Sequence, residues 1–190
     1  TALQTVSAAI SAGAGGTEDL TMGANAIVTF KNYVGSNSAG TANALVDVTT
    51  SAGSTVKFEK SVKAATLTLN ATGTTTFEDA VTLTGALAVA NGSTVTLGAG
   101  ITAGETVFTS VTGGSSFTTA ATVNLPQTFT SGVITLVDDS GATAAADALL
   151  LTLNSNVLAN YSAAANASDT GKLDITATRK SSSAIASALG

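Results

Sequence analysis

Apolar and polar residues alternate in steps of two along most of the chain. Val, Ile, Leu or Phe alternates with Thr or Ala in short runs, and Gly, Asn, Ser and Asp separate these runs. Such alternation is typical of strands with one buried face, and β-branched residues suit a pleated surface. Helical patterns cover only 142–150 and 181–189, so we expect an all-β protein. The predicted strands are 26–30, 44–48, 55–58, 66–69, 81–83, 87–89, 94–97, 106–108, 133–137, 151–153 and 173–176.

A longer period underlies this alternation. Glycine followed by hydroxyl residues recurs at nearly even spacing, at Gly53, Gly73, Gly92 and Gly114. A regular period of this size indicates stacked supersecondary units. We therefore predict a parallel β-solenoid (β-helix) with coils of about 20 residues, each coil starting at one of these glycines. The alternative is a β-sandwich or jelly roll, whose short strands also recur at close spacing.

The same period predicts which side chains form the core. The segment that begins at Phe58 is echoed one period later by the segment that begins at Phe77. Phe58, Phe77, Leu97 and Phe117 should therefore stack in neighbouring layers, about 4.8 Å apart as in any paired sheet. The full predicted core consists of Phe58, Leu69, Phe77, Leu87, Val89, Leu97 and Phe117.

We expect one elongated β domain over residues 1–190. Residues 51–140 carry the regular repeats, and residues 141–190 are predicted to form a cap-like C-terminal region. Residues 1–50 do not match the repeat, which indicates an N-terminal or capping segment. The most apolar stretch, 144–153, is interrupted by polar residues and is shorter than the roughly 18 residues of a membrane helix. No membrane span is expected in this segment.

Composition excludes several kinds of chemistry. The chain has no His and no Cys, so disulfides, thiol nucleophiles, Ser-His-Asp triads and Cys/His zinc sites are impossible. A net charge of −5 and an aromatic content of 4% disfavour binding to nucleic acid. Only 10% of residues are charged, so Thr, Ser, Asn and Gly must provide solubility. This composition favours an extracellular or cell-surface location.

The carboxylates do not form an obvious catalytic set. They occur in the adjacent pairs Glu18–Asp19, Glu78–Asp79 and Asp138–Asp139. Neighbouring strand residues point to opposite faces, so neither member of a pair converges with the other, as sugar cleavage would require. We predict no enzymatic activity and no cofactor.

Two weaker signals concern metals and glycans. Asp138, Asp139 and Asp169 are candidate calcium ligands, but Asp is also an ordinary turn residue and no calcium-loop motif is present, so no metal site is predicted. Asn70, Asn91 and Asn166 each begin an Asn-x-Ser/Thr triplet. These are glycan acceptors only in a host that has the machinery.

Two segments resemble a known family. Residues 82–97, Thr-Leu-Thr-Gly-Ala-Leu-Ala-Val-Ala-Asn-Gly-Ser-Thr-Val-Thr-Leu, resemble the passenger region of bacterial autotransporters and related large surface adhesins. Residues 171–182 are similar to the end of such passengers, and the resemblance covers about 51–190. It implies a right-handed parallel β-helix on the outside of a Gram-negative cell. It brings no catalytic residue to any position here.

Three functions follow as hypotheses. The first is a structural role as a stalk, fibre or surface-layer element. The second is a self-assembling subunit of an extracellular filament or sheath, with the chain itself as partner and the stretch 2–10 as a donated strand. The third is an adhesin that binds a cell-surface glycan or a host surface. An adhesin of this kind would need exposed aromatic rings, and Tyr33 and Tyr161 are the only tyrosines.

Overall fold

The computed structural model describes residues 2–13, 17–35, 44–111, 113–117, 121–139 and 150–189. The predicted helix at 142–150 lies, except for its last residue, outside this part of the chain, whereas the helix predicted at 181–189 is α2 (Ser182–Leu189). The strands are β1 (Leu3–Val6), β2 (Leu20–Met22), β3 (Ile27–Phe30), β4 (Leu45–Thr50), β5 (Thr55–Phe58), β6 (Val62–Leu69), β7 (Thr74–Phe77), β8 (Val81–Leu83), β9 (Leu87–Val89), β10 (Thr94–Leu97), β11 (Thr106–Ser110), β12 (Ser116–Phe117), β13 (Ala121–Asn124), β14 (Gly132–Asp139), β15 (Leu151–Leu153), β16 (Ala159–Ala165) and β17 (Lys172–Arg179).

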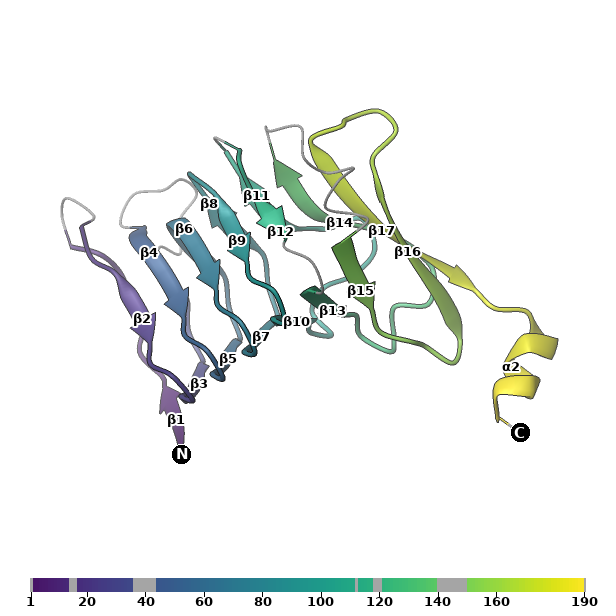
Figure 1. Ribbon diagram of the computed structural model, residues 1–190, viewed down its shortest axis with the longest axis horizontal. Coiled ribbons are helices and arrows are strands. Elements are labelled where there is room, and N and C mark those ends of the chain that lie inside the picture. The colour runs from purple at the N-terminus through teal and green to yellow at the C-terminus, as the bar shows by residue number, and fades with distance from the viewer. Residues whose placement is uncertain are drawn as a thin grey trace.

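The strands form two long sheets that face each other along a rod (Figure 1). The first sheet has seven strands in the order β1-β3-β5-β7-β10-β13-β15, and every neighbouring pair is parallel. The chain alternates between this sheet and the second one as it winds along the axis. The predicted parallel β-solenoid is therefore confirmed, and the parallel pairing is not that of a sandwich built from hairpins.

The second sheet divides into two strips partway along the rod. The eight-residue β6 pairs in parallel with both β8 and β9 of the next coil. A bend at Gly85 separates β8 from β9, and its amide donates to the Ala65 carbonyl at 2.8 Å. A Cβ at Gly85 would lie 2.9 Å from that carbonyl oxygen, so this close approach of the two coils requires glycine.

Stacked phenylalanines fill the interior beneath the first sheet. The ring centroids of Phe30 and Phe58 lie 5.1 Å apart, and those of Phe58 and Phe77 lie 5.4 Å apart, with nearly parallel planes. Phe108, from the second sheet, meets Phe77 edge-on at 5.2 Å. Leu97 lies one coil after Phe77, pairs with it and continues the same column. All seven residues predicted to form the core are buried.

The regular period holds only in the middle of the rod, because other coils carry insertions at a corner. Phe58 pairs with Phe77 at the expected separation, but it also pairs with Phe30, which is considerably more distant from it in the sequence. Val34 and Leu45 align with Val62 and Ala64, which are close together in the next coil, so the extra residues lie between Val34 and Leu45. Strands β1, β2 and β3 thus belong to the same two sheets, although the unequal spacing conceals the repeat in the sequence.

One predicted layer is wrong. Gly114 does not begin a further coil of the first sheet, and Phe117 does not stack on Leu97. Instead, β12 pairs with β9 in the second sheet, where Phe117 aligns with Val89. The true neighbour of β10 is β13, because the corner between Leu97 and β11 carries an insertion that delays the return of the chain.

The coil corners are shaped by residues with a left-handed backbone. Gly53, Thr72 and Gly92 have φ values of 70°, 61° and 78°, and each lies just before a strand of the first sheet. Gly73, which the sequence pattern selects as a coil start, does not have positive φ; the preceding Thr72 takes that conformation. Left-handed geometry at a β-branched residue is strained.

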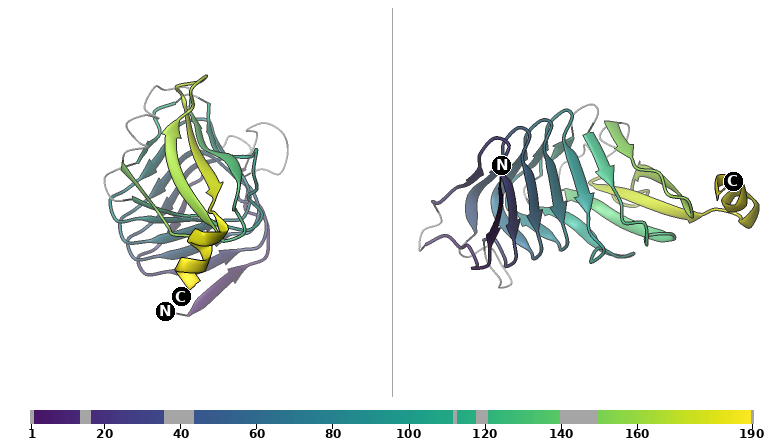
Figure 2. Two further views of the ribbon diagram at one scale, coloured as in Figure 1. Left: turned by 90° about the vertical axis from the view of Figure 1, so that its right-hand side faces the viewer. Right: turned by 90° about the horizontal axis from the view of Figure 1, so that it is seen from below.

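The two ends of the rod differ. At the C-terminal end, β17 pairs antiparallel with β14, and β16 pairs antiparallel with β17. This hairpin crosses the end of the coils, and α2 projects beyond it (Figure 2). At the N-terminal end β1 lies alone at the edge of the first sheet. The stretch 2–10, expected as a donated strand, belongs to this coil: β1 pairs with β3, and Ile10 bridges Val34.

Replacing Phe77 by Ala should lower the free energy of unfolding by about 3–5 kcal/mol, because the ring is buried between two neighbours and its loss leaves a cavity. Thr82→Val, on the outward face of β8, should change the same quantity by no more than about 0.5 kcal/mol. Urea unfolding followed by circular dichroism measures both variants. Equal losses would contradict the inward stack.

Corner strain predicts opposite effects at equivalent positions. Thr72→Gly should raise the free energy of unfolding by up to about 1 kcal/mol, because relief of left-handed strain exceeds the entropy cost of glycine. Gly92→Ala should lower it by about 1 kcal/mol. A Cβ at Gly92 would make only an ordinary van der Waals contact, with Thr72 N at 3.8 Å, so the variant measures backbone strain without a steric clash. Thermal unfolding of the two variants tests the sign of each change.

Candidate functional site

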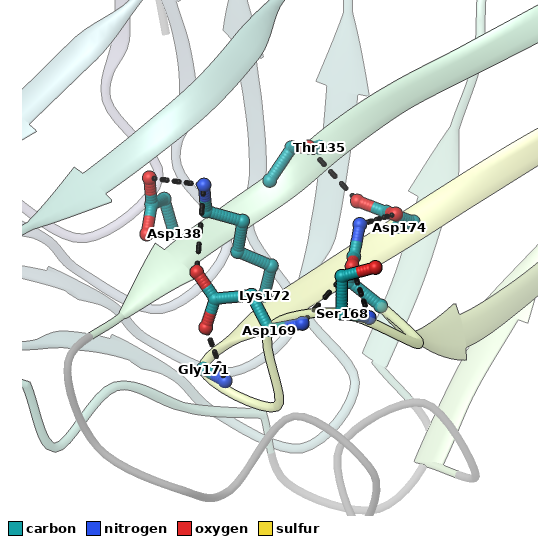
Figure 3. Close-up of polar contacts among 8 residues, drawn as sticks. Thr135, Asp138, Ser168, Asp169, Gly171, Lys172 and Asp174 are labelled. Carbon is teal, nitrogen blue, oxygen red and sulfur yellow. Dashed lines mark hydrogen bonds and ion pairs between the residues drawn. The ribbon is translucent and has the colours of Figure 1, made fainter.

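A network of polar side chains joins the turn of the β16–β17 hairpin to β14 (Figure 3). The turn is built by its own side chains. Asn166 Oδ1 accepts the backbone N–H groups of Ser168 at 2.8 Å and Asp169 at 3.1 Å. Asp169 Oδ1 in turn accepts the Gly171 N–H at 3.1 Å. These are the local bonds by which Asn and Asp fold a chain into a tight turn.

Asp174 holds this turn against the rest of the rod. One carboxylate oxygen accepts the Thr135 hydroxyl of β14 at 2.8 Å, and the other accepts the Asn166 side-chain N–H at 2.7 Å. The backbone N–H of Asp139 donates to the Gly171 carbonyl at 2.8 Å. The hairpin turn is thus tied to β14 by both side-chain and main-chain hydrogen bonds.

Lys172 adds a charged contact between the same elements. Its Nζ lies 3.4 Å from an Asp138 oxygen and 3.5 Å from an Asp169 oxygen. The negative charge of Asp138, with a hydrogen bond to it, raises the pKa of Lys172 above its ordinary value. The charged contact of Lys172 therefore contributes fully to stability at pH values below the ordinary pKa of lysine. This contribution is lost as the pH rises through the higher pKa that Lys172 has in the folded protein. All three side chains are partly exposed, so salt weakens the contact.

The three candidate calcium ligands do not face one another. Asp138 and Asp169 flank the ammonium of Lys172, whereas Asp139 is buried and its Oδ2 accepts the Ser115 N–H at 2.6 Å. Asp138 and Asp139 thus point to opposite faces of β14, as strand geometry requires. Over the described ranges, no three His, Cys, Asp or Glu side chains are grouped as metal ligands would be.

The other carboxylate pairs are spread along the rod. Lys57 Nζ donates a hydrogen bond to the Glu78 carboxylate at 2.9 Å. This hydrogen bond raises the pKa of Lys57, because its effect is larger than the opposing effect of partial desolvation. The Asp79 carboxylate accepts the N–H of Ala80, and Asp19 accepts the N–H of Asp47 at 3.2 Å. Each of these contacts fixes a turn or a neighbouring coil.

A second polar cluster fastens the last coils together, and sequence reasoning missed it. Asn154 accepts the Leu125 N–H at 2.8 Å and donates to the Leu125 carbonyl at 3.0 Å. The buried Asn156 donates to the Gln127 carbonyl at 3.0 Å and to the Tyr161 hydroxyl at 2.6 Å. The only sequence signal was this alternating pair of asparagines, which places both side chains on one face of an extended segment.

Tyr161 serves this cluster rather than the outer surface. Its ring stacks on Phe129 with centroids 6.0 Å apart, and its hydroxyl donates to the Phe129 carbonyl at 2.9 Å. The large apolar side chains that are exposed in the described residues are all Leu or Val. Tyr33 and Tyr161 are both half-buried, and all six phenylalanines are buried. Glycan binding stays a prediction.

A shallow groove of about 450 Å³ lies at the inserted corners. It is lined by apolar side chains, including Ile101 and Phe129, and by hydroxyls such as Thr102 and Ser131, with no charged residue. Such a lining offers neither a general acid nor a base, so the groove has no evident chemistry.

The three predicted glycan acceptors differ in their surroundings. Asn91 is exposed at a corner, and Asn70 is partly buried. The Asn166 side-chain nitrogen, where a glycan would attach, donates to Asp174. Glycosylation at these positions stays a prediction.

Comparison with known proteins adds no relative. No protein-family profile matches the chain, and no curated protein or solved structure is significantly similar to it. Within the described residues, no helix is long and apolar enough to cross a membrane. Function must therefore be inferred from the solenoid and its polar clusters.

Replacing Asp174 by Ala should lower the free energy of unfolding by about 1–3 kcal/mol, because Thr135 and Asn166 both lose a charged acceptor. Hydrogen exchange should speed up in β16 and β17 before it changes in β5 and β7. Ser168→Ala is the matched control, since the turn uses only the backbone N–H of Ser168. Uniform acceleration over the whole rod would show that the network does not act locally.

Proposed function

We propose that this chain is an extracellular structural element, a stalk, fibre or surface-layer component of a bacterial cell surface, without enzymatic activity. The observation that supports this most is the unbroken parallel ladder of the first sheet, from β1 to β15. Strands from every coil are joined there by main-chain hydrogen bonds, which makes a stiff rod that needs no ligand or metal. The resemblance of residues 82–97 to autotransporter passengers supports the same proposal.

The outer face of the rod suits this role. Threonines from successive coils align in one outward column of the first sheet, which consists of Thr55, Thr74, Thr94, Thr122 and Thr152. Threonine combines high strand propensity with a hydroxyl that remains hydrated. The column thus gives a neutral, soluble surface without charged groups, which is consistent with a chain exposed outside the cell.

Accessibility on intact cells tests the location. An antibody raised against the purified chain should label unpermeabilised cells of the natural host, and externally added protease should remove that signal. Labelling that appears only after lysis would overturn the proposed location.

Force spectroscopy tests the mechanical role. The chain, pulled from its two ends, should resist extension coil by coil. Phe77→Ala should lower the unfolding force because it removes the central ring of the stack, whereas Thr82→Val should leave the force unchanged. Extension at forces no higher than those of an unfolded chain would overturn the stiff-rod proposal.

A second candidate function, self-assembly by strand addition, is favoured by the N-terminal edge. Among the described strands β1 pairs only with β3, and Leu3 on its outward face is 64% exposed. An unpaired edge offers main-chain donors and acceptors to another copy of the chain. At the C-terminal end the antiparallel hairpin extends the second sheet, whereas β15 ends the first sheet and pairs only with β13 among the described strands.

Proline substitution separates this candidate from the first. The Val6 carbonyl accepts from Lys31, so Val6 faces β3 and the adjacent Thr5 presents its N–H to the open edge. Concentrated wild-type protein should form dimers in size-exclusion chromatography with light scattering. Thr5→Pro should abolish them, and Thr5→Ala, which keeps the N–H, should not. Monomers at every concentration would remove this candidate and leave the rod proposal intact.

A further inference from the structure

The turn between β9 and β10 contains a chemically reactive pair of residues, Asn91 and Gly92. Among all asparagines of the sequence, Asn91 alone is followed by glycine. The backbone nitrogen of a following residue can attack the asparagine side chain, and a residue with no Cβ hinders that attack least. The sequence pattern assigned Asn91 only as a glycan acceptor, which is a different chemistry.

The geometry of the turn leaves both reacting groups accessible. The Ser93 N–H donates to the Ala90 carbonyl at 3.1 Å, and Gly92 has φ of 78°, which is the pattern of a type II turn with Asn91 and Gly92 at its centre. Both central residues are exposed. No hydrogen bond of the described residues engages the Gly92 N–H or the Asn91 side chain. The nearest neighbour of a Cβ at Gly92 would be Thr72 N at 3.8 Å, so the turn has room to adjust.

Other asparagines are protected by their contacts or by the residue that follows. Asn154 precedes a serine, but both of its side-chain polar atoms are bonded to Leu125. Asn166 is held by Asp174 and by the turn that it folds. The Asn70 side chain makes no such bonds with the described residues, but the following Ala71 carries a Cβ. Asn70 is therefore a natural internal control, one coil away.

We infer that Asn91 is a site of spontaneous deamidation. The Gly92 nitrogen gives its proton to solvent base and bonds to Asn91 Cγ, the bond from Cγ to Nδ2 breaks, and the departing nitrogen takes a proton from solvent and leaves as ammonia. The resulting cyclic imide takes up one water molecule at either carbonyl, which yields aspartate or isoaspartate. The net reaction exchanges an amide for a carboxylate with water as the only co-reactant, and nothing is oxidised or reduced.

The product changes a corner of the rod. Either form adds one negative charge to a turn that bore none. The isoaspartyl form also routes the backbone through the Asn91 Cβ, which lengthens the connection from β9 to β10 by one atom. Because the reaction is spontaneous, the modified fraction should increase with the age of the molecule. Because this turn links the two sheets, the isoaspartyl form should loosen one coil locally.

Peptide mapping by mass spectrometry of the folded full chain, kept in mildly alkaline buffer made with heavy-oxygen water, tests the inference. The peptide with Asn91 should gain the mass of an amide-to-acid exchange with one heavy oxygen and resolve into two isomers. Its conversion should be at least about tenfold faster than that of Asn70, because the Cβ of Ala71 hinders attack by the backbone nitrogen there. Asn91→Gln should abolish the conversion.

A synthetic peptide covering residues 86–97 calibrates the time course. Intact Asn91 in the folded chain after this peptide has converted completely would overturn the inference, and so would conversion no faster than that of Asn70. Conversion to aspartate alone, without isoaspartate, would also overturn it, because a cyclic imide opens at either carbonyl and gives both isomers.

Discussion

Register between successive coils is the constraint on which the rest of the structure depends. Phe58 lies directly between Phe30 and Phe77 because three strands pair in parallel without a shift. A slip of one residue would turn every ring to the solvent, since side chains alternate between the two faces of a strand. The buried stack and the main-chain ladder therefore enforce each other, and each coil serves as the template for the next.

This constraint explains what the sequence could reveal. Between Gly53 and Leu97 successive coils are almost equal in length, so the repeat and its inward residues are visible directly. Elsewhere the same column continues, but insertions at the corners change its spacing. Phe30 was missed because an inserted corner separates it from Phe58 by more than one regular period, and Phe117 was assigned to the wrong sheet for the same reason.

The C-terminal fastening could not be predicted because its partners are distant in the sequence. Asp138 and Asp169 stood out as candidate calcium ligands, but the position of Lys172 between them becomes visible only when the hairpin folds back on β14. Tyr161 was named only as one of the two tyrosines that an adhesin could use, whereas its hydroxyl donates to the carbonyl of the distant Phe129. Neither contact follows from local spacing or alternation.

The corner insertions have a consequence for how such a rod can evolve. The connection from Leu97 to Phe108 is much longer than its counterpart from Phe77 to Val81, yet the strands on both sides keep their partners. A corner can therefore accept new sequence while the scaffold remains unchanged. Grafted epitopes or binding loops should be tolerated at 99–104. Related proteins can likewise change their exposed corner loops during evolution while the buried side chains stay the same.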